Sequence, residues 1–403
     1  MNVRTSVDHI NFIWTGRSIG FCLTSVVTAM VFKKYCTKTW QKMMFLAVAE
    51  IITGIFVICT PFARSFPVLI GIVTIFGMSL GLFDTADNSL MVYMFGPKKS
   101  RPFTQSVHAF VGVGFVFGSL MVQPFLPETN EGDSSVCPGE GDQATVEYTY
   151  KIMGGLPSIT WPFIIIGAWH FLTAAGMIIL GFSGLEMPSF YDKEENIEEK
   201  ASSKLKNIPN WWVYMLLVYV YYVLSCGLEG FFQSMTYTYG LCGPLKMSPS
   251  EANLLNGLYF GAFVVGRSSG ICISKIMSPT KIIILSIAGC FISSIILSIF
   301  ASYHKISLYT GVVIMGFAIA FQFASGISWT AKLFNVTGKS SFIFFLGGFS
   351  GFLSFPPIAG AIITMQGGQA GFFYLALATT ICQGGLFTVM SLLARKTRSQ
   401  GSH

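Results

Sequence analysis

The chain has 403 residues, of which 52% are hydrophobic and only 11% are charged, and its formal net charge is +7. A soluble domain carries about 25% charged residues, so this composition excludes a soluble globule, and the high hydrophobic content excludes an intrinsically disordered chain. The 42 glycines agree with membrane helices, whose backbones approach each other closely at small residues. The sequence therefore predicts an integral membrane protein.

Apolar runs long enough to cross a bilayer, which takes about 20 helical residues, occur along the whole chain. The eleven predicted spans lie at 10–32, 43–63, 67–95, 103–126, 158–182, 211–233, 253–276, 281–300, 307–330, 341–363 and 371–393. A stretch of mixed charge, typical of a solvated linker, separates the first five from the last six. We expect an all-α protein with an N-terminal bundle (1–185), a cytoplasmic linker (186–210) and a C-terminal bundle (211–403).

Lysine and arginine predict the orientation of these spans. With the N-terminus outside, the inner loops hold 18 of the 25 basic residues and the outer segments hold 5, while Arg17 and Arg267 lie within spans. Because cytoplasmic loops are enriched in these residues, we expect an external N-terminus and a cytoplasmic C-terminus. The nine cysteines contain no CxxC pair and indicate no zinc site, but Cys137 and Cys242 fall in loops and could form a disulfide.

The grouping of the spans indicates a carrier with two six-helix halves. Many secondary carriers consist of repeated halves, with the substrate site near the middle of the bilayer. The second half is complete here and the first is one helix short, so we expect this chain to lack the first helix of such a carrier. The sequences GRSIG (16–20) and GRSSG (266–270) stand at the second helix position of each half and agree with an internal repeat.

Seven ionisable side chains fall at membrane depth, where each costs about 2.5–3.5 kcal/mol on insertion scales. In a carrier they are the first functional candidates, and the alternative is an internal ion pair that only fixes helix packing. For Arg17 and Glu50, which lie nearer the span ends, we expect the side chain to extend toward the membrane surface. The seven are Arg17, Glu50, Asp84, Asp87, His108, Glu229 and Arg267.

The densest polar face lies in the sequence GMSLGLFDTADNSLM. Asp84, Asp87 and Asn88 are spaced i, i+3 and i+4, so a helix places them on one face. Carboxylates and an amide can accept hydrogen bonds from sugar hydroxyls or supply oxygen ligands to Na⁺. We expect Asp84 and Asn88 to contact substrate, and Asp84 and Asp87 to couple a cation. Gly77 and Gly81 precede this face and predict a close helix contact.

The second half offers amides, a carboxylate and an aromatic ring. These groups suit a sugar, which has an apolar CH face and a rim of hydroxyls. The expected substrate contacts there are Glu229, Gln233, Gln322, Ser325 and Trp329. For Trp329 the alternative is an interfacial anchor. In the first half, His108 could contact a hydroxyl, relay a proton or serve only in packing.

Motifs of enzymes and primary pumps are missing from the sequence. There is no GxxxxGKS, no HExxH and no GxSxG with plausible partners, and no basic-aromatic surface for nucleic acid. We therefore expect no enzymatic activity, no bound cofactor other than a co-transported Na⁺, and no nucleic-acid partner.

Three segments together carry a resemblance to a known family: GLFDTADNSLM, the GRS of the second helix position, and YVLSCGLEGFF. They are similar to the fucose-permease-like branch of the major facilitator superfamily, including its sodium-dependent sugar carriers. The resemblance implies two bundles that rock around a central sugar site lined by the first, fourth, seventh and tenth helices. It also implies roles there for Asp84, Asn88, His108 and Glu229. The segment AMVFKKYCTKTWQK departs from the superfamily pattern, because it keeps the basic residues of the loop GxLxDRxGR but lacks its acid.

The expected function is sodium-coupled uptake of glucose or a related hexose across the plasma membrane. Three alternatives remain open: a proton-coupled sugar carrier that uses Asp84 or His108, a facilitative carrier of sugar or urea, and a non-transporting membrane partner. The expected ligands are a small sugar and Na⁺, with no obligate protein partner.

Overall fold

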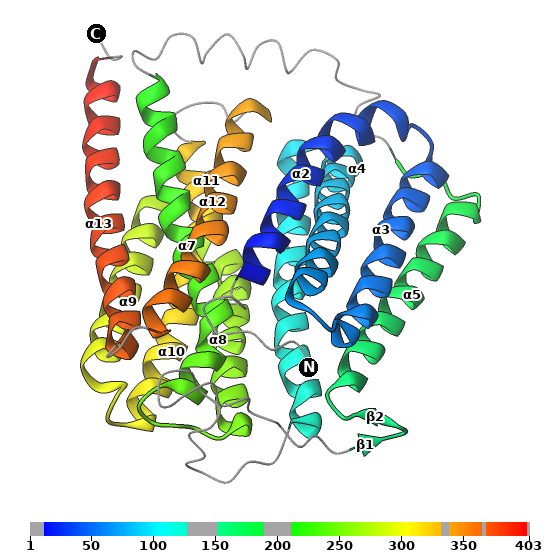
Figure 1. The fold of residues 1–403 in the computed structure, drawn as a ribbon. Helices are drawn as coiled ribbons and strands as arrows, with labels where there is room; N and C mark the ends of the chain where they lie inside the picture. The colour runs from blue at the N-terminus through cyan, green and yellow to red at the C-terminus, as the bar shows by residue number, and fades with distance from the viewer. Residues whose placement is uncertain (1–11, 127–151, 189–210, 332–337, 365–367, 401–403) are drawn as a thin grey trace. The chain divides into compact units, whose positions relative to one another are not determined.

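The computed structural model describes residues 12–126, 152–188, 211–331, 338–364 and 368–400 (Figure 1). These residues are helical apart from one hairpin of two-residue strands, β1 (Ile152–Met153) and β2 (Leu156–Pro157), and the segments that join the helices. Most of the predicted linker, together with Cys137, lies outside the described residues. Cys242 is disulfide-bonded, and the other described cysteines are free thiols.

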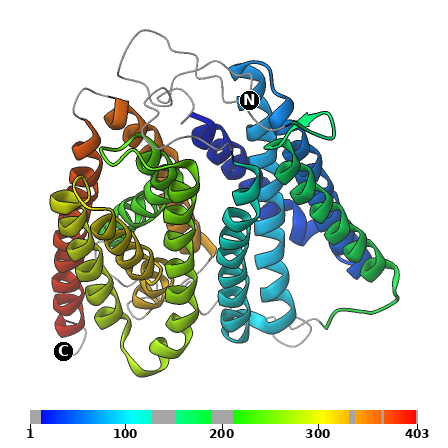
Figure 2. The ribbon, with the colours of Figure 1, turned by 90° about the horizontal axis from the view of Figure 1, so that it is seen from below.

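Backbone contacts divide the chain into two compact units. Unit 1 contains α2 (Phe12–Tyr35), α3 (Thr39–Cys59), α5 (Thr160–Phe182) and most of α4 (Phe66–Val122), apart from residues 105–119. Within it α3 and α5 lie side by side, in Figure 1 and in the perpendicular view of Figure 2. Short 3₁₀ turns, Thr60–Phe62 and Gln123–Phe125, follow α3 and α4.

Unit 2 contains residues 105–119 of α4 and the helices from α7 onward. These are α7 (Trp211–Cys242), α8 (Pro249–Ile276), α9 (Pro279–Phe300), α10 (Lys305–Ile319), α11 (Gln322–Thr330), α12 (Gly338–Thr364) and α13 (Gly368–Gln400). The helix α7 contacts α8, α11, α12 and α13, so its side chains reach most of the unit. Residues 105–119 pack on α8, where Phe115 and Phe260 stack with ring centroids 4.6 Å apart.

The predicted all-α membrane fold is confirmed, whereas the count of eleven spans is not. Among the described residues, nine helical segments are long and apolar enough to cross a membrane, and Ala109–Phe125 is a shorter apolar helix. The predicted span 253–276 corresponds to α8, which is not among the nine. Asn253, Asn256, Arg267 and Lys275 lower its hydropathy.

The predicted spans 67–95 and 103–126 form one unbroken helical segment, α4, of 57 residues. This segment is not straight. The rings of Phe95 and Phe103 stack with centroids 4.0 Å apart, whereas eight residues of a straight helix rise about 12 Å. The backbone therefore bends sharply between them, where Pro97 and Pro102 cannot donate helical hydrogen bonds.

The predicted span 307–330 is interrupted. The helix α10 ends at Ile319 and α11 begins at Gln322. Such a break leaves backbone carbonyls without helical partners, and in a bilayer other groups must satisfy them. Ser286 of α9 donates its hydroxyl to the carbonyl of Ala318, near the end of α10, at 2.7 Å. On the other side of the break, Tyr221 of α7 donates to the carbonyl of Gln322, the first residue of α11, at 3.3 Å. Neighbouring helices thus stabilise the break.

Glycines set the closest helix contacts in unit 1. A Cβ atom on Gly77 of α4 would overlap the carbonyl of Arg17, and one on Gly20 of α2 would overlap the carbonyl of Thr74. Thr24 also donates its hydroxyl to the carbonyl of Met78 at 2.7 Å. The predicted close contact at the Gly77 segment is therefore present, and its partner is the GRSIG helix.

The second copy of the GRS motif makes the corresponding contact in unit 2. A Cβ atom on Gly266 would lie 2.6 Å from the carbonyl oxygen of Phe317, on α10. Each copy thus lets its helix closely cross the helix that lies two further along the chain, α4 for α2 and α10 for α8. This parallel supports the internal repeat.

Candidate functional site

A buried polar cluster that contains an ion pair lies between α7 and α8 in unit 2. Gln233 donates Nε2–H to Glu229 Oε1 at 3.0 Å, so the predicted shared face of these two side chains exists. The other carboxylate oxygen, Oε2, lies 3.6 Å from Nη2 of Arg267. Both charged side chains are about nine-tenths buried, with 10% and 9% of their surface exposed. The three residues form a buried, internally paired group at membrane depth.

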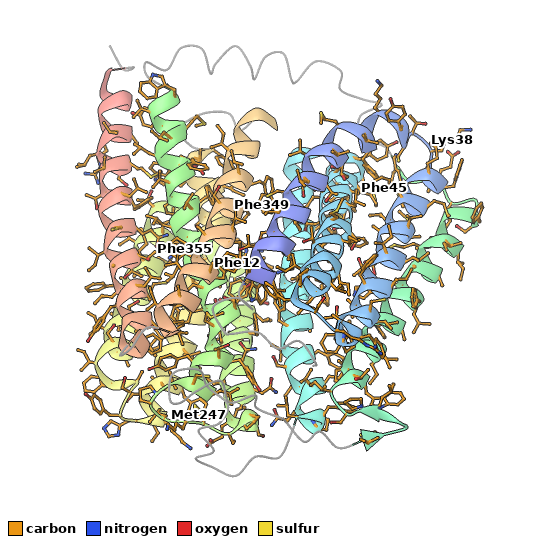
Figure 3. The ribbon with its side chains drawn as sticks, in the orientation of Figure 1. Phe12, Lys38, Phe45, Met247, Phe349 and Phe355 are labelled. Carbon is orange, nitrogen blue, oxygen red and sulfur yellow. The ribbon has the colours of Figure 1, made fainter. Side chains whose placement is uncertain are left out.

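Aromatic rings surround this cluster. The guanidinium of Arg267 lies over the ring of Phe263, 4.8 Å from its centroid, and the hydroxyl of Tyr259 donates to the backbone carbonyl of Glu229 at 3.4 Å. On the adjoining face of α7, the ring of Phe355 from α12, which Figure 3 labels, packs over Gly227. A carboxylate, an amide and a guanidinium among aromatic rings can recognise a ligand that has both hydroxyls and an apolar face.

Arg267 is the member of the cluster that was not among the expected substrate contacts. Its place at membrane depth is visible in the sequence, but its pairing with Glu229 is not. The two residues lie on different helices, and helical periodicity relates only residues of the same helix.

Gln322, predicted to bind substrate, lies in a second polar group of unit 2. Its Oε1 accepts from Ser225 Oγ and from Gln383 Nε2, each at 2.7 Å, and its Nε2 lies 3.5 Å from Cys290 Sγ. Gln322 and Gln383 have no exposed surface. This network ties α7, α9, α11 and α13 together at the break between α10 and α11.

The other two predicted residues of α11 are also buried. Ser325 is 8% exposed, and Trp329 is 6% exposed and packs against Phe387 of α13 with ring centroids 5.4 Å apart. The structure thus does not bring Gln322, Ser325 and Trp329 into contact with Glu229 through any described hydrogen bond or ion pair. Their substrate role remains a prediction.

The predicted acidic face in unit 1 is present on α4. Asp84, Asp87 and Asn88 are all partly buried, and Asn88 donates Nδ2–H to the backbone carbonyl of Asp84 at 2.8 Å. Neither aspartate forms an ion pair with a described residue. Two partly buried carboxylates without a protein cation leave room for a bound cation to balance their charge. The side chain of His108 lies outside what the structure describes.

The expected extension of Glu50 toward the membrane surface is wrong. Glu50 is 9% exposed, and its Oε2 lies 2.5 Å from His170 Nδ1 and accepts from Thr173 Oγ1 at 3.0 Å. Both partners lie on α5, which crosses α3 closely where Gly54 meets Gly167. Arg17 is partly buried, and its guanidinium lies over the rings of Trp14 and Phe76.

No family model matches the chain, but several known proteins and a solved structure are similar to it. It is 26% identical to sodium-dependent glucose transporter 1 of Xenopus laevis, over 100% of this chain and 78% of the relative. It is 24% identical to the Homo sapiens protein of that name, over 98% and 74% of the two chains. It is 22% identical to human major facilitator superfamily domain-containing protein 4A, over 90% and 81%.

Among solved structures, a mutant of the nucleoside transporter NupG is similar, with a TM-score of 0.62. The similarity covers 96% of this chain and 91% of that one, at 12% sequence identity, and so shows the fold. The predicted two-bundle fold of major facilitator type and the predicted resemblance to sodium-dependent sugar carriers are confirmed. The chain is a multi-pass membrane protein with a carrier's fold.

Proposed function

We propose that this chain is a secondary carrier in the plasma membrane that moves glucose or a closely related hexose together with Na⁺. The observation that carries the proposal is the buried Glu229–Gln233–Arg267 cluster in unit 2. Two relatives that match nearly the whole chain, both named sodium-dependent glucose transporter 1, support the choice of substrate and cation.

Hydrogen-bonding capacity connects the cluster to a sugar. The carboxylate of Glu229 accepts hydrogen bonds, and the amide of Gln233 retains an acceptor oxygen and a second N–H beside its bond to Glu229. A hydroxyl both donates and accepts, so it can bind between these groups. A buried site of this kind discriminates strongly against an analogue that lacks the bonded hydroxyl, because its own polar groups then stay unpaired.

The acidic face of α4 is the proposed cation site. Na⁺ is a hard cation that prefers oxygen ligands, and Asp84 and Asp87 carry carboxylates that no described cation neutralises. We propose that Na⁺ and sugar each stabilise the same outward-facing state, which is the condition for coupling. A charge that moves inward down 100 mV then contributes roughly 2.3 kcal/mol.

Substrate identity is tested with the purified chain in proteoliposomes under an inward Na⁺ gradient. Uptake of labelled glucose is compared with uptake of a labelled nucleoside and of labelled urea. We expect saturable glucose uptake that unlabelled hexose competes away, well above the other two. Uptake of the nucleoside or of urea without glucose uptake would contradict the proposed substrate.

A further inference from the structure

The guanidinium of Arg267 has donors that the protein does not use. Arginine carries five N–H groups. Its Nε is buried without a partner, and Nη2 approaches Glu229 only to 3.6 Å, beyond hydrogen-bond distance. No other described residue accepts from it. A buried donor without an acceptor is costly, so this side chain is suited to an oxygen atom of a ligand.

The charge of this side chain is nevertheless balanced. Glu229 provides one negative charge next to the one positive charge of Arg267. Within the described residues of unit 2, every other charged side chain lies at or near a helix end. The cluster as a whole is therefore electrically neutral in a region of low dielectric constant, where an added net charge is strongly unfavourable.

We propose that Arg267 donates a hydrogen bond to a substrate oxygen and that, with Glu229, it restricts the site to uncharged polyols. The inference rests on the proposed function and extends it to selectivity. A neutral sugar satisfies the free donors without changing the net charge. A sugar acid, although it offers better acceptors, brings a negative charge close to Glu229, which repels it.

Replacement of Glu229 by glutamine should reverse this preference. Arginine does not lose its proton in proteins, so the E229Q site carries a full, uncompensated positive charge. That charge attracts a carboxylate, and the guanidinium can bind it through two parallel hydrogen bonds. The geometry of the site changes little, because glutamine has nearly the same shape as glutamate.

The test measures equilibrium binding of glucose and glucuronate to the full-length purified chain. We expect the wild type to bind glucose at least tenfold more tightly than glucuronate, and the E229Q variant to shift this ratio at least tenfold toward glucuronate. The R267K variant keeps the charge balance but replaces the planar guanidinium and its five N–H groups with an ammonium. It should therefore bind glucose more weakly, while the ratio of the glucose and glucuronate affinities stays unchanged. The matched control is E251Q, which makes the same change in the partly exposed Glu251–Lys305 pair of unit 2 and should leave the ratio unaltered.

Two results overturn the inference while leaving the proposed function intact. One is a wild type that binds glucose and glucuronate equally well, and this result does not depend on whether any variant folds. The other is an E229Q variant that elutes from a size-exclusion column as the wild type does, and so is folded, but has the wild-type ratio of glucose and glucuronate affinities. A purely structural ion pair would give that second result. If the wild type binds no hexose at all, the proposed function fails and the inference fails with it.

Discussion

Glu229 makes three separate contacts, and each restrains it in a different way. Gln233 donates to one carboxylate oxygen, Arg267 balances the charge at the other, and Tyr259 holds the backbone carbonyl. A carboxylate at membrane depth costs a few kcal/mol unless such partners are present. The carboxylate is therefore held in one orientation before any ligand binds, which is the condition for selective recognition.

Replacement of Gln233 by leucine tests the sugar site. We expect Q233L to weaken glucose binding roughly tenfold to a hundredfold, because a buried hydrogen-bonding group is lost. A deoxy sugar that lacks the bonded hydroxyl should bind wild type and variant about equally poorly, and the sodium dependence of the remaining uptake should not change. If Q233L binds glucose as the wild type does, the sugar site lies elsewhere, and Gln322 and Ser325 become the residues to test.

Replacement of Asp84 by asparagine tests the cation site. D84N keeps the size and some hydrogen bonding of the side chain but removes its charge. We expect the apparent glucose affinity to lose its dependence on Na⁺ while the amount of protein at the membrane stays near normal. Loss of folded protein would instead show that Asp84 serves in helix packing, and the E251Q variant controls for the loss of a carboxylate elsewhere.

Residue-scale prediction from the sequence succeeded within helices and failed between them. The faces shared by Glu229 and Gln233, and by Asp84, Asp87 and Asn88, follow from helical periodicity alone. The pairing of Arg267 with Glu229 depends on how α7 and α8 pack, as the pairing of Glu50 with His170 depends on α3 and α5. Such tertiary contacts leave no periodic signal in a single sequence.

The helices of this protein approach each other most closely at positions where the side chain is small. Gly77 of α4 lies against the backbone of α2, and Gly266 of α8 lies against the backbone of α10. Without a hydrophobic driving force between helices in lipid, association depends on close packing and interhelical hydrogen bonds. The two GRS segments therefore determine how closely α2 and α8 approach their neighbours, and this contact was predictable at Gly77 from its spacing with Gly81.

Alanine at Gly77 tests this packing. G77A places a methyl group into the carbonyl of Arg17, so we expect it to destabilise unit 1 by about 1–3 kcal/mol, as overpacking does. The matched control is G71A on the same helix, where a Cβ atom meets nothing within 4 Å. We expect G71A to be neutral or slightly stabilising. The readout is thermal unfolding in detergent, and equal melting temperatures for the two variants would contradict the packing argument.

The contact between the starts of α8 and α10 should be sensitive to pH. Lys305 donates to Glu251 at 2.7 Å and, as the main cause, holds the pKa of that carboxyl below its ordinary value of 4.5. A lowered pKa in the folded state means that the pair contributes stability above 4.5 and loses it as the pH falls through the lowered value. The pair is partly exposed, so the contribution is about 0.5 kcal/mol or less.

Replacement of Lys305 by methionine tests this contact. K305M should lower the melting temperature slightly at neutral pH, and its difference from the wild type should vanish well below pH 4.5. The control K281M removes an exposed lysine that forms no ion pair with a described residue, and it should show no pH-dependent difference. A K305M effect that persists in acid would show that packing of the lysine stem, and not the ion pair, is responsible.

The positions of the membrane-spanning helices could be predicted better than whether the chain stays helical within or between them. Nine segments found in the structure correspond to predicted spans, because long apolar runs mark helices that cross lipid. The break between α10 and α11 was missed, since hydroxyl groups of other helices satisfy its backbone and the local sequence stays apolar. The continuity of α4 was missed because the basic residues between the predicted spans 67–95 and 103–126 were assigned to an inner loop, whereas the chain remains helical there.

On the scale of the whole molecule, the polar groups at membrane depth fall into separate sets. Unit 1 holds two carboxylates without a described cationic partner, and unit 2 holds a neutral ion pair with free donors. We propose that this separation assigns the cation to the first unit and the sugar to the second. Coupling then requires that both ligands favour the same conformation of the carrier.

Sodium-driven accumulation tests the central claim most directly. The purified full-length chain in proteoliposomes receives labelled glucose with an inward gradient of Na⁺, of choline, or of protons without Na⁺. We predict that glucose accumulates above its external concentration only with the Na⁺ gradient and that collapse of the gradient releases it. Accumulation with the proton gradient, or mere equilibration that is identical in Na⁺ and choline, would contradict sodium coupling.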